Sequence, residues 1–162
     1  MILYLLRHGD AVDSGFDDSS RPLSPLGEEQ AASVANVFSM FHLPLDAVLS
    51  SPLVRAKQMA EIISAAFKNV KCTATEYLVP GTNEKQLFRQ LNELKKQSVL
   101  LVGHEPHVRT TASMLLWGSR HGQIEFRKAT ILCIECVHAV QPESGMLKWM
   151  LTADHMSMLR GR

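Results

Sequence analysis

The 162-residue sequence predicts an α/β fold with three layers, in which helices cover both faces of a mainly parallel central sheet. Two apolar runs, Met1–Leu6 and Ser98–Val102, have the length and composition of strands that are buried on both faces. Segments with apolar residues at helical spacing alternate with these and other β-like runs. No linker divides the chain, so we expect a single domain over residues 1–162.

After the first strand, the N-terminal half contains two helices that each start at a serine-proline pair. Ser24-Pro25 places a capping side chain before a proline, and Ser51-Pro52 repeats this signal directly after a short strand at Asp46–Ser50. Apolar residues recur at helical spacing after both pairs. They are Ala31, Val34, Ala35, Phe38 and Phe41 in the first helix, and Leu53, Ala56, Ala60, Ile63 and Phe67 in the second.

The C-terminal half continues the alternation and ends in two strands. A strand at Val70–Thr75 precedes a helix that Asn83 caps, and Pro106 suits the start of a further helix after Ser98–Val102. The runs Ala129–Val137 and Met146–Thr152 flank a tight turn, so we expect them to pair antiparallel. The last ten residues show no clear pattern and predict a loose tail.

Composition limits the classes of function. The chain is 46% hydrophobic and 20% charged, and its formal net charge is +1. This charge argues against a broad nucleic-acid or anionic-membrane surface but is compatible with a small anion pocket. The sequence lacks a bilayer-length apolar stretch and a signal peptide, and it has only three cysteines. We therefore expect a cytoplasmic monomer with neither a nucleic-acid nor a membrane partner.

Cys133-Ile134-Glu135-Cys136 matches a C-x-x-C pattern but lies in a β-like run. Residues three apart in a strand point to opposite faces, and Cys72 stands alone in the sequence. These cysteines therefore predict buried small apolar side chains. We expect no metal site and no cofactor.

Four basic or potentially basic residues are expected to meet at one edge of the sheet. Arg7 and His8 follow the first strand, Arg55 lies in the first turn of the helix after the second strand, and His104 follows Ser98–Val102. The carboxyl ends of parallel strands face one crevice, and helix N-termini there add positive partial charge. Arginine forks match the geometry of phosphate oxygens, so this arrangement predicts a phosphate site.

Three of these segments, taken together, resemble the signature of the histidine phosphatase superfamily. They are Arg7-His8-Gly9, Ser50-Ser51-Pro52-x-x-Arg55-Ala56 and Gly103-His104. The resemblance spans nearly the whole chain and implies a phosphoglycerate mutase-like fold and a phosphatase.

Within the superfamily, the sequence is similar to the SixA-type branch of bacterial phosphohistidine phosphatases. The similarity rests on the short length and on the segments Arg7-His8-Gly9-Asp10-Ala11, Arg21-Pro22-Leu23-Ser24-x-x-Gly27 and Gly103-His104-Glu105-Pro106. This branch lacks the large insertions of the mutase and phytase branches.

The resemblance implies a role for each residue of the pocket. His8 attacks phosphorus and is transiently phosphorylated, while Arg7, Arg55 and His104 bind the phosphoryl oxygens. Arg21 completes the pocket in the SixA-type branch. We expect the arginines to lower the pKa of His8, and a backbone carbonyl near Gly9 to fix its tautomer. Gly9 itself would let the backbone approach the ligand.

The general acid has no convincing match. Asp18, Glu76 and Glu84 are the candidates, and the aspartates at positions 10 and 17 are weaker ones. An alkoxide leaving group needs a placed acid, whereas the imidazole of phosphohistidine leaves more readily. The missing acid therefore favours a phosphohistidine protein as the substrate, for example a histidine phosphotransfer domain.

Two other functions stay open on the sequence. The nearer alternative is a phosphatase of the same superfamily that cleaves a sugar or nucleotide phosphate. The more distant one is a phosphate-binding module without catalysis.

Overall fold

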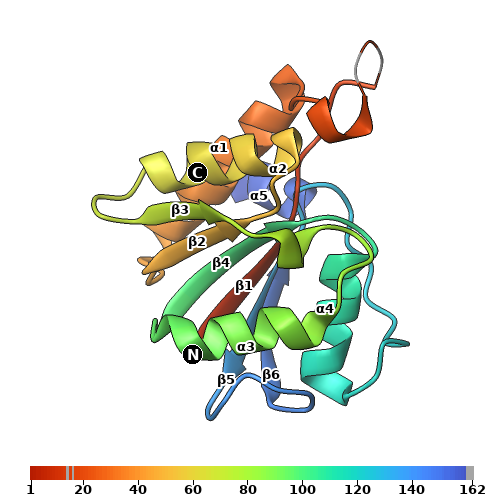
Figure 1. Cartoon of the computed structure of the whole chain (residues 1–162). Coiled ribbons are helices and arrows are strands. Elements are labelled where there is room, and N and C mark those ends of the chain that lie inside the picture. The colour runs from red at the N-terminus through yellow and green to blue at the C-terminus, as the bar shows by residue number, and fades with distance from the viewer. Residues whose placement is uncertain (14, 16, 160–162) are drawn as a thin grey trace.

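The computed structural model describes residues 1–13, 15 and 17–159, and it contains a six-stranded sheet with the order β3-β2-β4-β1-β5-β6 (Figure 1). The neighbouring pairs among β1, β2, β3 and β4 are parallel, whereas β5 is antiparallel to β1 and β6 is antiparallel to β5. The strands are β1 (Ile2–Arg7), β2 (Ala47–Ser50), β3 (Lys71–Ala74), β4 (Ser98–Gly103), β5 (Ile131–Cys136) and β6 (Gly145–Leu151). This confirms the mainly parallel sheet and the antiparallel final pair.

Helices cover both faces of this sheet, as the sequence predicted. In Figure 1, α1, α2 and α5 lie on one face, and α3 and α4 lie on the other. The helices are α1 (Pro25–Met40), α2 (Val54–Ala65), α3 (Glu84–Leu94), α4 (His107–Trp117) and α5 (Ala153–Leu159), with short 3₁₀ turns at η1 (Asp18–Ser20) and η2 (Glu76–Leu78).

The central strands send alternate side chains into two separate cores. Leu3 and Leu5 of β1 pack in the core under α3 and α4, whereas Tyr4 and Leu6 pack in the core under α1 and α2. Alternation follows from the strand's period of two. Both faces are covered, so the strand is apolar at every position, which explains its uninterrupted hydrophobic sequence.

The direction of the crossovers places the end of β1 in a crevice. The chain moves outward from β1 to β2 and β3 with α1 and α2 on one face, then returns to β4 with α3 on the other. Right-handed crossovers require this change of face when the direction reverses. The neighbours β1 and β4 therefore lead into helices on opposite faces, and α/β folds bind ligands at such a point.

Two of the predicted helix starts are confirmed and one is shifted. The Ser24 hydroxyl accepts from the Gly27 N–H, and the Asn83 side chain accepts from the Lys85 N–H. Ser51, by contrast, follows the end of β2 directly, and its N–H donates to the Val102 carbonyl of β4 at 2.9 Å. The N-cap of α2 is therefore Leu53.

The predicted loose tail is wrong for residues 153–159, which form α5. Met156 of this helix is buried in the core under α1 and α2. Ala153 and Leu159 also pack against this core. Tertiary contacts therefore order a seven-residue helix that is too short to be stable alone. The rest of the predicted tail, residues 160–162, lies outside the described residues.

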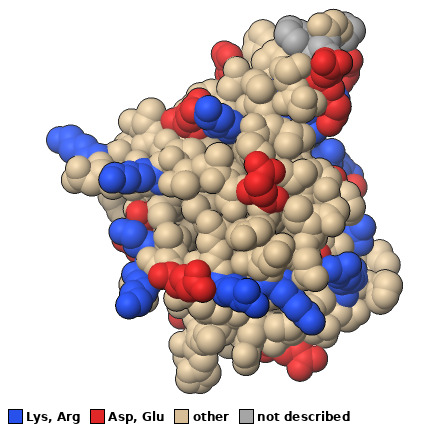
Figure 2. All heavy atoms as spheres, viewed as in Figure 1, with Lys and Arg blue, Asp and Glu red and all other residues tan. Residues whose placement is uncertain are grey.

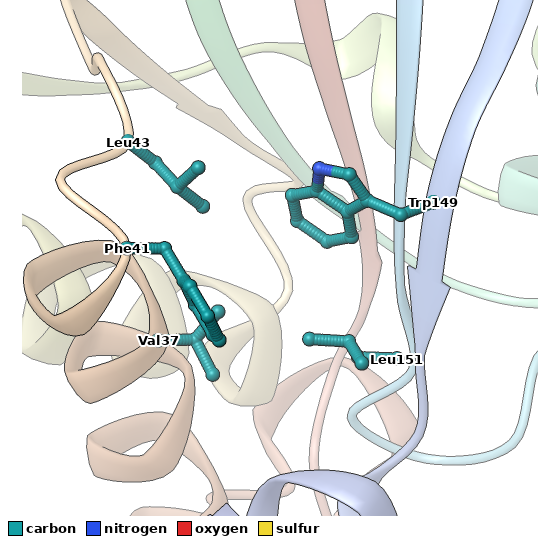
Figure 3. A pocket seen from close by; sticks show the side chains of 5 residues that line it. All are labelled: Val37, Phe41, Leu43, Trp149 and Leu151. Carbon is teal, nitrogen blue, oxygen red and sulfur yellow. The ribbon is translucent and has the colours of Figure 1, made fainter.

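One face of the molecule carries charged side chains of both signs (Figure 2). On the face in Figure 2, acidic and basic side chains are interspersed. Figure 3 shows an apolar hollow of about 270 Å³ between the C-terminal part of α1 and β6, lined by Val37, Phe41, Leu43, Trp149 and Leu151. In the described part of the chain, no helix combines the length and the apolar character that crossing a bilayer requires.

Replacing Met156 tests whether α5 is part of the folded core. Met156 is 1% exposed, whereas Met158 in the same helix is 71% exposed. Met156→Ala should lower the free energy of unfolding by about 2–5 kcal/mol, because it leaves a cavity. Met158→Ala should change it by less than about 0.5 kcal/mol. Urea unfolding of both variants measures the difference, and equal effects would show that α5 does not contribute to the core.

Candidate active site

The pairing of β1 with β4 brings two histidines together. Arg7 lies opposite Gly103 in the parallel register, and the His8 N–H donates to the Gly103 carbonyl at 2.9 Å. The next residues along the two strands, His8 and His104, therefore lie side by side, with ring centroids 4.9 Å apart. Both are buried, at 8% and 2% exposure.

One backbone contact defines the tautomer of His8. Its Nδ1 lies 2.7 Å from the Gly9 carbonyl oxygen, which can only accept a hydrogen bond. Nδ1 therefore carries the proton, and Nε2 keeps its lone pair. The Arg55 Nε–H donates to this Nε2 at 3.2 Å. The partner near Gly9 is the kind that the sequence predicted.

Arg55 is held at His8 by the segment that includes η1. Its Nη1 donates to the Asp18 carbonyl oxygen, and its Nη2 lies 3.2 Å from Asp18 Oδ2. With the bond to His8, all three nitrogens of this buried guanidinium have a partner. The Asp18 carboxylate thus accepts from an N–H group with which Arg55 could bind another oxyanion.

Other polar atoms around His8 are buried without a partner. Neither ring nitrogen of His104 has a hydrogen-bond partner among the described residues, and the same holds for Arg7 Nε. Arg7 is nonetheless held in place, because its Nη1 donates to the Phe126 carbonyl at 2.8 Å. Buried groups of this kind are rare in folded proteins, and here they point to a ligand that completes their hydrogen bonds.

Burial keeps both histidines neutral. It is the largest cause that lowers the pKa of His8 from 6.5 to about 4, and the positive charges of Arg55, Arg7 and Lys128 lower it further, against the Gly9 hydrogen bond. Burial also lowers the pKa of His104 to about 3, followed by the effects of His8 and Arg55. The predicted direction is right for His8, but desolvation is the first cause and the arginines are secondary.

Gly9 contacts protein on several sides. A Cβ at Gly9 would lie 2.9 Å from Gln30 Oε1 and 3.1 Å from the Gly27 Cα. The missing side chain therefore lets α1 approach β1, and the expected approach of the Gly9 backbone to a ligand stays a prediction. The Gly9 N–H donates to Met59 Sδ at 3.1 Å. Met59 is thus a supporting residue that only the three-dimensional structure reveals.

Arg21 lies in the predicted region, but its guanidinium is engaged elsewhere. Its Nε donates to the Val12 carbonyl at 2.7 Å, and its two other nitrogens pair with Asp13 at 2.6 Å and Asp18 at 3.3 Å. In this structure Arg21 thus holds Asp18, and through Asp18 it contacts Arg55.

Two of the three candidate acids are in ion pairs. Burial raises the pKa of Asp18, but its bonds to Arg55 and Arg21 hold it below the usual value. Burial also raises the pKa of Glu84, yet backbone, Thr110 and Arg120 contacts lower it overall. Glu84, the first residue of α3, has its Oε2 2.6 Å from Arg120 Nη2. Glu76 lies on η2 and is exposed.

Asp10, one of the weaker candidates, is also paired. Its Oδ1 lies 2.7 Å from Lys128 Nζ, and its Oδ2 accepts from the Ser24 hydroxyl. These bonds hold the pKa of Asp10 below its usual value, Lys128 being the largest cause. Lys128 matches no motif in the sequence, and only the contact across 118 positions of the chain reveals it.

Cys133 and Cys136 are buried, as the sequence predicted, whereas Cys72 is only partly buried. Cys133 belongs to the core under α1 and α2, whereas Cys136 belongs to the core on the opposite face. Within residues 1–13, 15 and 17–159, no group of three or more histidine, cysteine or acidic side chains is arranged to hold a metal ion.

Comparisons with known proteins identify the family of this chain. The family model of the histidine phosphatase superfamily (branch 1) matches residues 3–79. A phosphohistidine phosphatase SixA homolog of Haemophilus influenzae is 31% identical over 143 residues, which cover 81% of this chain and 85% of that protein. The phosphohistidine phosphatase SixA of Escherichia coli (strain K12) is 26% identical over 165 residues, which cover 99% of both chains.

A solved structure extends the match to the whole fold. The protein histidine phosphatase SixA complexed with tungstate superposes with a TM-score of 0.82 at 24% identity, covering 96% of this chain and 99% of that one. The chain therefore belongs to the histidine phosphatase superfamily, and it is a phosphatase. Within the superfamily it is similar to SixA, as its motifs predicted.

The low pKa values of the two histidines make stability depend on pH. Below pH 6.5 the unfolded chain protonates both imidazoles, whereas the folded protein does so only near 4 for His8 and near 3 for His104. The free energy of unfolding should therefore fall as the pH decreases from 6.5 towards 4. Urea unfolding across this interval measures the slope.

The control for this prediction is the double variant His8→Ala/His104→Ala. Without the two imidazoles, the loss of stability between these pH values should be smaller than in the unsubstituted protein. An identical slope in both proteins would show that these histidines are not buried in the neutral form.

Proposed function

We propose that the protein is a phosphohistidine phosphatase that works through a phosphohistidine intermediate on His8. The observation that carries this proposal is the state of His8: Nδ1 donates to the Gly9 carbonyl, so the unprotonated Nε2 is left as the nucleophile. The low pKa keeps this nitrogen free of a proton at neutral pH. The two closest pocket groups, Arg55 and His104, are suited to bind an oxyanion.

The reaction would run in two displacements. First, His8 Nε2 attacks phosphorus, the P–N bond of the substrate breaks, and the substrate imidazole leaves with a proton from water. Water then attacks the phosphorus of the intermediate, the bond to Nε2 breaks, and inorganic phosphate leaves while His8 is restored. Splitting one displacement into two is the benefit of a covalent nucleophile. Neither step uses a metal or a cofactor.

Charge neutralisation would come from the buried donors. Arg55 would exchange its contacts with His8 Nε2 and Asp18 for phosphoryl oxygens, which frees the lone pair of Nε2 for attack. A guanidinium fork can bind either oxyanion. Arg7 and His104 would donate from the nitrogens that are buried without a partner, with His104 protonated at one ring nitrogen only. Arg21 would hold Asp18 and thereby the segment that covers Arg55. Such fixed donors stabilise the charge that spreads over the equatorial oxygens.

The state of the carboxylates favours a phosphoramidate over an ester. Asp18 and Glu84 are ion-paired with low pKa values, so neither is prepared to donate a proton to an alkoxide. Imidazole, with an ordinary pKa of about 6.5, is a far better leaving group and takes its proton from water. The names of the two SixA relatives fit this preference. We therefore infer a phosphohistidine side chain presented by another protein, for example a histidine phosphotransfer domain.

A substrate comparison tests this proposal. A phosphohistidine peptide should be hydrolysed with a kcat/KM on the order of 100-fold above phosphoserine and sugar phosphates, because esters lack the acid they need. EDTA should leave the rate unchanged. His8→Ala should abolish turnover and the phosphoenzyme seen after rapid quenching, with unfolding still cooperative. Faster hydrolysis of esters would overturn the substrate, and a phosphoenzyme in His8→Ala would overturn the nucleophile.

A second variant tests the donor that faces Nε2. Arg55→Ala should raise the activation barrier by about 2–4 kcal/mol, as expected for the loss of one preorganised donor. The matched control is Arg89→Ala, which removes the same charge from an exposed position of α3. Steady-state kinetics on the phosphohistidine peptide compares the two variants. If both are equally active, Arg55 does not bind the transition state.

A further inference from the structure

Lys128 lies on the β5 side of β1, whereas Arg55 and His104 lie on the β4 side. In the strand order, β4 lies on one side of β1 and β5 on the other. Arg55 and His104 follow strands on the β4 side, whereas Lys128 lies just before β5. Its neighbour Ala129 donates a backbone hydrogen bond to the His8 carbonyl at 3.1 Å. The segment that carries Lys128 is therefore tied to the backbone of the candidate nucleophile.

The ammonium group of Lys128 has a defined position. Its Nζ lies 2.7 Å from Asp10 Oδ1, and the other carboxylate oxygen of Asp10 is held by the Ser24 hydroxyl at the start of α1. Asp10 follows His8 and Gly9 in the chain. Three elements thus fix this charge: the end of β1, the start of α1 and the segment before β5. The positive charge of Lys128 acts on His8 through space, since it is one of the causes that lower the pKa of that imidazole.

We propose that Lys128 is a phosphoryl-binding residue that supplies positive charge to the pocket from the β5 side. The proposal rests on the phosphatase function above and adds a residue to its substrate site. Lysine has three N–H donors on a flexible stem, so Nζ can keep its bond to Asp10 and give another to a phosphoryl oxygen. Arg55 and His104 would bind oxygens from the β4 side, and Lys128 would complete the enclosure of the dianion.

Stability alone does not explain this ion pair. The Lys128 side chain is 39% exposed and that of Asp10 is 28% exposed. Ion pairs that are this accessible contribute little to folding, because water screens them and two side chains lose freedom. A lysine held near a buried, neutral histidine instead raises the local positive potential, which attracts a phosphate dianion.

Calorimetric titration of the intact protein with inorganic phosphate at low ionic strength tests the proposal. Lys128→Met should weaken phosphate binding by about 5- to 10-fold, the effect of removing one nearby, partly screened charge. Lys128→Arg should restore the affinity to within about 2-fold, since it keeps the charge. The matched control is Arg127→Met, which removes a charge from the adjacent, 66% exposed side chain that pairs with Glu125. It should change the affinity by less than about 2-fold.

Asp10→Asn separates a contact with phosphate from an indirect effect. If Lys128 acts only by anchoring Asp10, Asp10→Asn and Lys128→Met would weaken binding equally, and the proposal would be overturned. If Lys128 binds the phosphoryl group itself, Asp10→Asn should keep the affinity within about 3-fold, because the cation remains. Equal affinities of Lys128→Met and the unsubstituted protein would likewise overturn it.

The two proposals fail in different ways. Hydrolysis of the phosphohistidine peptide, together with unchanged phosphate binding in Lys128→Met, would leave the proposed function standing and remove Lys128 from the site. An unsubstituted protein that neither binds phosphate nor hydrolyses the peptide would overturn both.

Discussion

The register between β1 and β4 is the constraint on which the rest of the molecule depends. These parallel strands occupy the centre of the sheet, and their side chains supply both cores. The pairing of Arg7 with Gly103 also decides which residues emerge together where the strands end. A shift of one residue would move every side chain to the other face and separate His8 from His104. The energy that buries the apolar strands therefore also sets the geometry of the site.

The site combines buried positive charge with neutral histidines, and this arrangement lowers the free energy of unfolding. Arg55 is buried against His8 and compensated by Asp18, while Arg7 and His104 keep nitrogens without a partner. Each buried group that lacks a hydrogen bond costs on the order of 1–3 kcal/mol. The burial of apolar side chains in the two cores offsets this cost. A phosphoryl group would supply the missing acceptors, so the same feature that weakens the free protein prepares it for an oxyanion.

The differences between expectation and structure have specific physical causes. The final helix was missed because it has only seven residues, too few for Ala153, Met156 and Leu159 to be recognised as a helical stripe. Ser51 has the signature of a helix cap, yet its N–H is used by β4, a contact that local sequence does not reveal. In each case a distant segment determined the outcome.

By itself, the sequence determined the order of strands and helices, the three layers and the family. Apolar periodicity and short motifs such as Arg7-His8-Gly9 are local signals, and they reflect local propensity and burial directly. Only the tertiary structure decided which nitrogen of His8 is free and that burial is the first cause of its low pKa. It also decided that Asp18, Met59 and Lys128 contact the neighbours of His8, namely Arg55, Gly9 and Asp10. The tautomer follows from the backbone conformation at the adjacent Gly9. The other properties arise from contacts between segments far apart in the chain, where distance and desolvation, and not residue type, set the energy.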